Sequence, residues 1–405
     1  MTDSISIMDR RKFIIRSAVL GCSAAASPLI TPIALAQAPW EQRLVVIILR
    51  GGMDGLEVVR PVGDPLFSRY RPTLARGRGS DLDGFFALNE NLSDLMPLWR
   101  AGELGFAHAV ATPYRDKRSH FDGQDLLEAG TRTLKGAGRD GWLNRMLGQV
   151  PGVTMKTAFA VGHGDMILLS GDVPTSSWSP EARLDLSPRG RRLLEVLYHD
   201  DPLFQEAGRT ALEMTGVPEG GGGKRASGNE IMAMMMRGAR AVRAGSLARF
   251  AAERLNEDTR IAAFSINGWD THRTQTNGIR RPLGELSDAI LTLRKGLGAN
   301  WSKTVVLAMT EFGRTVRENG SRGTDHGTAG VMLMAGGALR GGKVYGRWPG
   351  LGESDLYQNR DLLPTSDVRA YAAYAMRGLF GLERGVLERA VFPGLDMGED
   401  PGIIA

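Results

Sequence analysis

Cysteine and histidine are both scarce in this chain of 405 residues, which contains one cysteine and six histidines. The cysteine, Cys22, lies in an N-terminal segment that we expect to be removed. The mature protein is therefore predicted to have no disulfide, no thiol nucleophile and no thiolate metal site. Any metal ion would be held by carboxylate, imidazole or hydroxyl groups, which suits zinc, manganese, magnesium or calcium better than copper(I).

Three other absences exclude classes of protein. No apolar run reaches the ~20 residues that a membrane helix requires. The formal net charge is +5, but no basic run is interleaved with aromatic residues, so we predict no nucleic-acid partner. No G-x-G-x-x-G motif follows the first predicted strand, so the sequence lacks the dinucleotide-binding signature of many oxidoreductases. A cofactor-bearing oxidoreductase is supported only by the predicted export route, which is described below.

The N-terminal segment has the features of an export signal. Arg10 and Arg11 precede Phe13 and a weakly apolar stretch, which ends in an A-x-A cleavage site at residues 34–36. We interpret residues 1–36 as a twin-arginine signal peptide. This predicts a periplasmic or secreted protein, with the twin-arginine translocation machinery as a partner.

Removal of the signal peptide lowers the formal charge of the protein and removes its only cysteine. The segment carries four basic and two acidic residues, so its cleavage lowers the formal charge from +5 to +3. The sequence Val19-Leu20-Gly21-Cys22 loosely resembles a lipidation box. We therefore expect contact with a membrane only if Cys22 is lipidated.

Short apolar runs alternate with helical patterns along the rest of the chain. Runs that predict buried strands are residues 43–52, 104–111, 157–162, 260–266 and 303–310. Segments with helical spacing and capping signals are residues 88–102, 119–130 and 284–298. This alternation predicts an α/β fold with a doubly wound, mostly parallel sheet and helices on both faces, formed by residues 37–405 as a single domain.

The middle of the chain has a different pattern. Residues 179–256 read as a mostly helical insertion, interrupted at residues 216–230 by a segment that contains Gly220 to Gly223. No strand precedes these glycines, so we interpret the segment as a flexible surface loop and not as a phosphate cradle.

Polar side chains follow several of the predicted strands. Ligands of doubly wound sheets bind outside the carboxyl ends of the strands, so these side chains are candidates for a metal site. The candidate ligands are Asp54, Asp270, His272, Glu311, Asp325 and His326. Together they offer the oxygen and nitrogen atoms that one or two divalent ions need, and such ions can hold a phosphate or sulfate ester.

Two further residues are candidates for the chemistry. Ser119 begins a predicted helix, whose N-terminus favours an anion, and is a candidate nucleophile. Arg314 is placed to hold an oxyanion. Plainer interpretations stand beside these: Ser119 as an ordinary N-cap, Asp54 as a turn residue, and His120 as a packing or supporting residue.

The remaining histidines give weaker signals. His108 and His163 follow apolar runs and read as core or rim residues. His199 reads as a surface residue.

A series of motifs resembles a known family. The motifs are VVIILRGGMDGL, RSHFDGQDLLEAG, DGWLNR, GWDTH, TEFGRT, GTDHG and PTSDVRA, in this order. Together they resemble the domain-of-unknown-function family 1501, whose members carry twin-arginine signals and are grouped with the alkaline phosphatase and sulfatase superfamily. The resemblance implies a doubly wound α/β sheet with a metal site at the strand ends.

The resemblance also implies roles for individual residues. Asp54 resembles the first-strand aspartate that binds one metal, and Ser119 resembles the nucleophile. Asp270 and His272 resemble the ligand pair of the other metal, which His326 completes. Two departures from the superfamily's pattern suggest that one metal is lost or bound differently: the gap from Asp270 to His272 is short, and Glu311 is followed by Phe312 where a histidine is usual. Asp325 is left as either a ligand or a partner of His326.

These observations lead to one functional hypothesis and one alternative. The hypothesis is an exported metal-dependent hydrolase of a phosphate or sulfate ester, with zinc, manganese or calcium as one or two bound ions. Its substrate would be an anionic small molecule or glycan. The alternative is a non-catalytic periplasmic binding or assembly protein on a degenerate hydrolase fold, which the shortened ligand set favours.

Overall fold

The structure is a computed structural model that describes residues 40–77, 79–115, 117–136, 140–162, 166–178 and 243–405. Ala38–Ala405 form one compact unit. The predicted signal peptide and most of the predicted helical insertion, with its glycine-rich loop, lie outside the described residues. The same holds for His163 and His199.

A nine-stranded sheet forms the centre of this unit. Eight strands follow the order β7 (Ser176–Trp178), β6 (Ala158–Val161), β8 (Ile261–Asn267), β1 (Arg43–Arg50), β9 (Thr304–Met309), β10 (Gly330–Ala335), β5 (Leu104–Ala111) and β11 (Val344–Tyr345), and β14 (Ser366–Asp367) also pairs with β5. Strand β10 is antiparallel to both of its neighbours, β9 and β5. The other pairings in this sheet are parallel, which confirms the predicted doubly wound, mostly parallel α/β fold.

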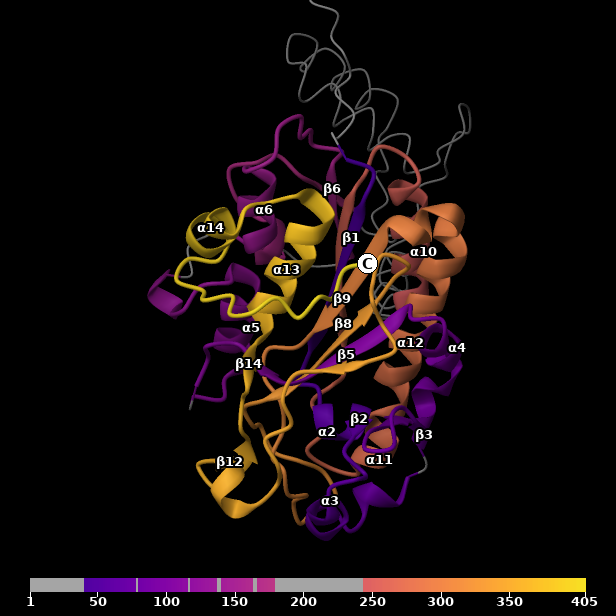
Figure 1. The fold of residues 1–405 in the computed structure, drawn as a ribbon, viewed down its shortest axis with the longest axis vertical. Coiled ribbons are helices and arrows are strands. Elements are labelled where there is room, and N and C mark those ends of the chain that lie inside the picture. The colour runs from indigo at the N-terminus through magenta and orange to yellow at the C-terminus, as the bar shows by residue number, and fades with distance from the viewer. Residues whose placement is uncertain (1–39, 78, 116, 137–139, 163–165, 179–242) are drawn as a thin grey trace, which may run out of the picture. The chain divides into compact units, whose positions relative to one another are not determined.

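Helices cover both faces of the sheet, as the buried strands require. In β1, Val45, Ile47 and Leu49 belong to one hydrophobic core and the alternate residues belong to the other. The first core includes residues of α10 (Ala244–Leu255) and α12 (Arg280–Leu297), and the second includes residues of α6 (Trp142–Leu147) and α13 (Val368–Phe380). Figure 1 shows these two helix layers on either side of β1, β8 and β9.

The remaining elements are short. The helices are α2 (Gly55–Val58), α3 (Pro65–Tyr70), η1 (Leu74–Arg76), η2 (Glu90–Leu95), α4 (Met96–Arg100), α5 (His120–Ala129), η3 (Leu134–Gly136), η4 (Ile167–Leu169), α11 (Gln275–Gly278), η5 (Gly298–Lys303), η6 (Glu353–Asp355), α14 (Arg384–Val386) and η7 (Leu387–Val391). The strands are β2 (Val59–Arg60), β3 (Gly79–Asp81), β4 (Ala87–Asn89), β12 (Leu356–Tyr357) and β13 (Asp361–Leu362). Within the described residues, no helix is both long and apolar enough to cross a membrane.

The predicted elements agree with the structure in their positions more than in their ends. The helix predicted at 119–130 is α5, with Ser119 at its N-cap and Gly130 in the left-handed conformation after its last residue. The helix predicted at 88–102 begins as the 3-10 helix η2 and becomes α-helical only at Met96. Strand β10 was not predicted, although its six residues are all buried.

The direction of β10 decides which loops meet. The carboxyl ends of β1, β5, β8 and β9 lie at one edge of the sheet, because these strands run in the same direction. Since β10 is antiparallel to β9, the loop between them, residues 310–329, stays at that edge. Four loops with candidate site residues therefore lie next to one another.

Candidate metal centre

Three histidines surround Asp270 at this edge of the sheet. His120 comes from the first turn of α5, His272 from the loop after β8, and His326 from the loop before β10. The Nε2 atom of His272 is 3.0 Å from Asp270 Oδ1, and that of His326 is 3.3 Å from the same oxygen. The Nε2 atom of His120 is 3.5 Å from Asp270 Oδ2.

One atom from each of three residues forms the tightest group of potential ligands. These residues are His120, Asp270 and His326, and their ligand atoms all lie within 4.8 Å of one another. His272 is beside this group, because its Nε2 atom is 3.0 Å from His326 Nε2 as well as from Asp270. Among the described residues, this is the one group of at least three such side chains that is compact enough to hold a metal ion.

Each imidazole is held through its Nδ1 atom by an oxygen acceptor. His120 Nδ1 lies 2.8 Å from Glu311 Oε1, and His272 Nδ1 lies 3.2 Å from Asp325 Oδ1. His326 Nδ1 lies 2.9 Å from the carbonyl oxygen of Arg118. Carboxylates and carbonyls only accept hydrogen bonds, so Nδ1 is the donor in all three rings. In its neutral form, each ring therefore presents a free electron pair at Nε2.

These free electron pairs face one another and the carboxylate of Asp270. Such an arrangement is unfavourable unless a proton or a cation lies between the atoms. His120 Nε2 is buried without a hydrogen-bond partner. The shortest contacts in the cluster are 3.0 to 3.5 Å, and the ligand atoms of His120, Asp270 and His326 all lie within 4.8 Å of one another. The ligands of a tetrahedral zinc ion with bonds of about 2.0–2.1 Å are ~3.3 Å apart. The donor set thus fits a bound divalent ion.

The charges of the cluster favour positive charge at its centre, either a bound cation or a proton on His120. Burial raises the pKa of Asp270, but Arg314 and the histidines lower it further, so the net pKa is below its usual value. The same balance lowers the pKa of Glu311, where the hydrogen bond from His120 opposes burial. Burial also lowers the pKa of His326, whereas the hydrogen bond to Glu311 raises that of His120.

The net charge follows from these directions. Three ionised carboxylates, Asp270, Glu311 and Asp325, surround the imidazoles together with one guanidinium, that of Arg314. With neutral imidazoles, the formal charge of the cluster is −2, which a divalent cation balances.

Glu311 has a role other than the ligand role expected from the sequence. Its side chain is fully buried, and its Oε1 atom accepts hydrogen bonds from His120, from Gln124 at 3.1 Å and from the backbone N–H of Gly51 at 2.9 Å. Oε2 accepts a hydrogen bond from Thr310 at 2.9 Å. Glu311 therefore holds the His120 ring from behind, as carboxylates behind metal-bound histidines do.

Asp325 contacts His272 and not His326, the histidine with which the sequence pairs it. Its Oδ1 atom accepts a hydrogen bond from Asn319 at 3.1 Å in addition to its contact with His272. Asn319 also donates to the backbone carbonyl of His272 at 3.0 Å. Asp325 and Asn319 thereby fix the orientation of His272.

Asp54 lies outside the cluster, contrary to the expectation that it binds metal. Its carboxylate is 1 % exposed, and both oxygens accept hydrogen bonds from Arg71, at 2.7 and 3.1 Å. Gln275 donates to the same carboxylate at 2.5 Å. The guanidinium supplies the positive charge that a metal ion would otherwise supply, and it leaves no oxygen of Asp54 facing the histidines.

Arg314 also has a role other than the one expected. Its guanidinium is buried and donates to the carbonyls of Gly52, Thr324, Gly51 and Trp269 and to Asp270 Oδ1 at 2.5 Å. All three of its nitrogens are thus bonded within the protein. Arg314 links the loops and orients Asp270, and its guanidinium does not face the open side of the site where an oxyanion would bind.

Ser119 is the N-cap of α5, and its Oγ atom accepts a long hydrogen bond of 3.4 Å from the backbone N–H of Asp122. The hydroxyl is half-buried and directly precedes His120. Arg118, the residue before it, has a φ of +54°. This left-handed conformation costs a non-glycine residue on the order of 1 kcal/mol, and it turns the Arg118 carbonyl toward His326.

Two glycines permit the close contact between the loops. A Cβ atom at Gly323 would lie 2.4 Å from the backbone carbon of His272, and one at Gly327 would lie 2.4 Å from the backbone carbon of Arg314. Any side chain at these positions would separate the loops. The glycine-rich sequence SRGTDHG thus serves the packing that brings His326 to Asp270.

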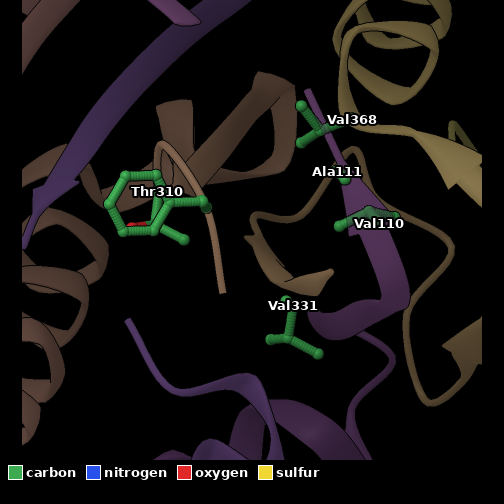
Figure 2. A pocket seen from close by; sticks show the side chains of 7 residues that line it. Val110, Ala111, Thr310, Val331 and Val368 are labelled. Carbon is green, nitrogen blue, oxygen red and sulfur yellow. The ribbon is translucent and has the colours of Figure 1, made fainter. Parts of the chain in front are cut away.

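The side of the cluster that faces the sheet is closed. Phe312 is buried and lies against the His120 ring, with ring centroids 5.0 Å apart. Behind it is a cavity of about 10 Å³ whose lining includes Val110, Thr310 and Val331 (Figure 2). This volume is about that needed for one water molecule. A substrate must therefore reach the histidines from the solvent side, where Asp270 and His272 are partly exposed.

His120 was not among the ligands predicted from the sequence. Beside the candidate nucleophile Ser119, the sequence favours a packing or supporting role for it. The signal that identified the other candidates applies to it as well, because the loop before His120 leaves the carboxyl end of β5 at the same edge of the sheet. His108, interpreted as a core residue, is 2 % exposed and stacks on Phe86.

The fold and this cluster define an α/β protein with a candidate metal centre at the carboxyl edge of a doubly wound sheet. The chain belongs to the family described as "Protein of unknown function (DUF1501)", whose sequence model matches residues 110–391. This confirms the family predicted from the motifs. No curated protein matches the sequence.

Several solved structures are similar to this chain at low sequence identity. The C-terminal periplasmic domain of EcEptC from Escherichia coli, in complex with Zn, is 9% identical over 73% of each chain, with a TM-score of 0.37. The lipoteichoic acid synthase LtaP from Listeria monocytogenes is 8% identical, with 92% of this chain and 78% of that chain covered and a TM-score of 0.42. A protein in the alkaline phosphatase superfamily from Vibrio parahaemolyticus is 13% identical, with 84% and 72% covered and a TM-score of 0.35.

Proposed function

We propose that this protein is an exported, metal-dependent hydrolase of a phosphate or sulfate ester. The observation that carries the proposal is the arrangement of three imidazoles around Asp270, each with Nδ1 held by an acceptor and Nε2 directed into the cluster. The motifs that resemble the alkaline phosphatase and sulfatase superfamily support the same class of reaction.

The donor set favours zinc or manganese over calcium. His120, Asp270 and His326 would hold the ion, with His272 as a fourth donor. Three imidazole nitrogens and one carboxylate match the ligands of zinc, whereas calcium prefers six or more oxygens. When bound, such an ion polarises an ester oxygen and stabilises the negative charge that develops on it. One ion fits the described residues better than two, since Asp54 is paired with Arg71.

Ser119 is the proposed nucleophile. Its hydroxyl directly precedes a proposed ligand, and the N-terminus of α5 favours the negative charge of an ester group. The hydroxyl accepts one weak hydrogen bond, so its proton remains free to leave when the oxygen attacks.

The first test is the metal content of the mature protein purified without chelators. We expect about one equivalent of zinc or manganese by mass spectrometry, in line with the single donor set. The Asp270→Ala/His272→Ala double variant should lose most of it while remaining folded. An unmodified protein without any metal would refute the proposal, because the cluster would then be held by protons alone.

The second test separates the two roles of Ser119. Ser119→Ala removes both the hydroxyl and the helix cap, Ser119→Asn keeps a capping oxygen without the hydroxyl, and Ser119→Thr keeps both. We expect the alanine and asparagine variants to lose hydrolysis of phosphate and sulfate esters by at least about a thousandfold with metal retained. The threonine variant should keep a measurable fraction. Equal turnover in all of them would exclude Ser119 as the nucleophile.

One observation favours the alternative of a non-catalytic binding protein. Asp54, Glu311 and Arg314, which the sequence assigned to chemistry, are all buried and bonded within the protein. The open side of the cluster therefore offers fewer reactive groups than expected. Stoichiometric metal without hydrolysis across a broad panel of phosphate and sulfate esters would favour this alternative.

The export route and its partners are part of the same proposal. Arg10, Arg11 and the small residues at 34–36 support export by the twin-arginine machinery and a periplasmic or secreted location. Membrane attachment would require lipidation of Cys22. N-terminal sequencing of the secreted protein tests both points, because it reports the cleavage site.

A further inference from the structure

Each histidine of the cluster has an exposed arginine close to it in the sequence. Arg118 comes two residues before His120, Arg273 directly follows His272, and Arg322 comes four residues before His326. Within the described part of the chain, none of the three guanidinium groups forms an ion pair or a side-chain hydrogen bond. Arg118 is close enough to Asp361 for its charge to oppose the rise in the pKa of that carboxyl that burial causes. All three groups are exposed and can meet an anion from solvent.

Backbone contacts bring these three arginines to the same edge of the sheet. The Arg118 carbonyl accepts a hydrogen bond from His326 Nδ1 at 2.9 Å. The Arg322 carbonyl accepts a hydrogen bond from the N–H of Gln275 at 2.9 Å, two residues after Arg273. The Nε2 atoms of His272 and His326 are 3.0 Å apart, so the arginines belong to loops that meet at the cluster.

Exposed basic side chains are grouped in short segments of these loops. Segments 117–121, 271–275 and 319–324 contain the three arginines and Lys117 but no aspartate or glutamate. Carboxylates flank these segments: Asp270 and Asp325 are bonded to histidines of the cluster, Glu318 accepts hydrogen bonds from the backbone N–H groups of Thr73 and Leu74, and Asp122 lies in the first turn of α5. Exposed guanidinium groups thus lie on the loops around a centre that we propose binds a cation.

Backbone strain gives an independent indication that the side chains matter. Arg118 has a φ of +54° and Arg322 a φ of +58°. Glycine or asparagine adopts this left-handed conformation with less strain than arginine. Residues held in such conformations cluster at functional sites, where the surrounding structure maintains them. At both positions the turn directs a backbone carbonyl to a hydrogen bond, Arg118 to His326 and Arg322 to Gln275, and the strain that arginine adds there is consistent with a role for the side chains as well.

We propose that the substrate carries further sulfate or phosphate groups beside the ester that is hydrolysed, and that Arg118, Arg273 and Arg322 bind these groups. Planar guanidinium groups pair with sulfate and phosphate oxygens through two parallel hydrogen bonds. A simple ester with a single charge would leave most of this basic surface unused. The inference rests on the proposed function, since it identifies the substrate class of the same site.

The test compares the binding of anions with increasing charge to the metal-loaded mature protein. The probes are inorganic sulfate, a monosulfated disaccharide and a highly sulfated tetrasaccharide, measured by calorimetry at low and at high salt. The test variant is Arg118→Asn/Arg273→Gln/Arg322→Asn. The matched control, Arg249→Gln/Arg281→Gln/Lys295→Gln, removes the same number of exposed charges from α10 and α12.

We expect the test variant to bind the tetrasaccharide about a hundredfold more weakly at low salt, or about fivefold for each guanidinium removed. The control should change the affinity by less than about twofold, and the salt dependence should become shallower only in the test variant. Metal content and thermal stability should be maintained in both, with stability equal or higher in the test variant because asparagine tolerates positive φ.

Equal weakening in the test and control variants would overturn the proposal, because net charge alone would then explain binding. Unchanged binding in both would overturn it as well. The proposed function fails separately: arginine-dependent binding without hydrolysis of any sulfated or phosphorylated ester refutes the hydrolase and keeps the anion-binding surface. Hydrolysis with affinity that is independent of these arginines keeps the hydrolase and refutes the surface.

Discussion

Two aspartates follow neighbouring parallel strands, Asp54 after β1 and Asp270 after β8, and their surroundings differ completely. Asp54 is buried, and Arg71 and Gln275 occupy its oxygens. The side chain of Asp270 is 45% exposed and lies among three imidazoles. The strand end brings a carboxylate to the edge of the sheet, but the segment that covers it decides whether it can bind an ion from solvent.

The histidines show the same contrast. His108 is buried, its Nε2 atom is 3.0 Å from the carbonyl of Val59, and burial lowers its pKa to about 4. The cluster histidines keep Nε2 directed toward Asp270 and are partly exposed. A sealed polar region around Asp54 and an open cluster around Asp270 therefore lie side by side at one edge of the sheet. The first is closed to solvent and the second is open to it.

Breaking the sealed region should have the largest effect. Arg71→Ala leaves the carboxylate of Asp54 buried without its partner, which is expected to lower the free energy of unfolding by about 3–5 kcal/mol. Urea denaturation measures the loss. Asp270→Asn, its counterpart in the open cluster, should cost less than about 1 kcal/mol in the metal-free protein. Similar losses for both variants would contradict the contrast between the two regions.

The buried histidine should make stability depend on pH in acid. The pKa of His108 is about 4 in the folded protein and about 6.5 in the unfolded chain, so the unfolded state binds more protons between these values. Its contribution is present above pH 6.5 and is lost as the pH falls toward 4. Replacing His108 with Gln should therefore destabilise the protein by roughly 2–3 kcal/mol less at pH 4.5 than at pH 7.

The comparison between variant and unmodified protein is necessary because Glu57 acts in the opposite direction. Burial raises the pKa of Glu57 to about 7. The folded state then binds more protons, so this contribution falls as the pH rises from about 4.5 to 7. A His108→Gln effect that is the same at both pH values would show that His108 is not buried in its neutral form.

Glu311 shares a property with each region: its carboxylate is buried, as that of Asp54 is, and it accepts a hydrogen bond from His120 of the open cluster. Glu311→Gln should weaken metal binding about 10- to 100-fold, or by about 1.4–2.8 kcal/mol, because a neutral amide orients and polarises the ring less well. Competition with a chelator measures this affinity. Glu128→Gln is the control. Glu128 is a buried carboxylate of α5, the helix that carries His120, and it pairs with Arg50. A comparable loss in the control would assign the effect to helix stability.

The smallest expected effect concerns the cap of α5. Ser119→Ala should lower the free energy of unfolding by about 1 kcal/mol or less, because the capping hydrogen bond to Asp122 is long. Ser119→Asn should restore most of this loss. Chemical denaturation of the metal-free proteins measures both values. A loss of several kcal/mol would mean that the hydroxyl has structural contacts beyond the cap.

Which residues could be predicted from the sequence depended on local signals. Asp270 and His326 were identified because they follow or precede buried runs and lie beside glycine-rich turns. His120 was missed because its neighbour Ser119 gave a more familiar signal. Asp54 and Arg314 are expected from the sequence to act in the chemistry because both follow strands. In the structure, Asp54 pairs with Arg71, and Arg314 donates to the backbone carbonyls of Gly52 and Gly51. No local sequence pattern indicates these partners.

The sequence by itself determined five of the buried strands, the capped helix α5, the family and the edge of the sheet where polar side chains gather. Each of these depends on the order of residues within a short segment, which periodicity, capping and motifs record. The tertiary structure alone decided which polar groups remain open, because that depends on contacts between distant segments. His326 and Arg118 are 208 positions apart in the sequence, and Arg314 and Gly51 are 263 apart. The antiparallel direction of β10 is the clearest case, since it keeps the loop with His326 at the same edge as Asp270.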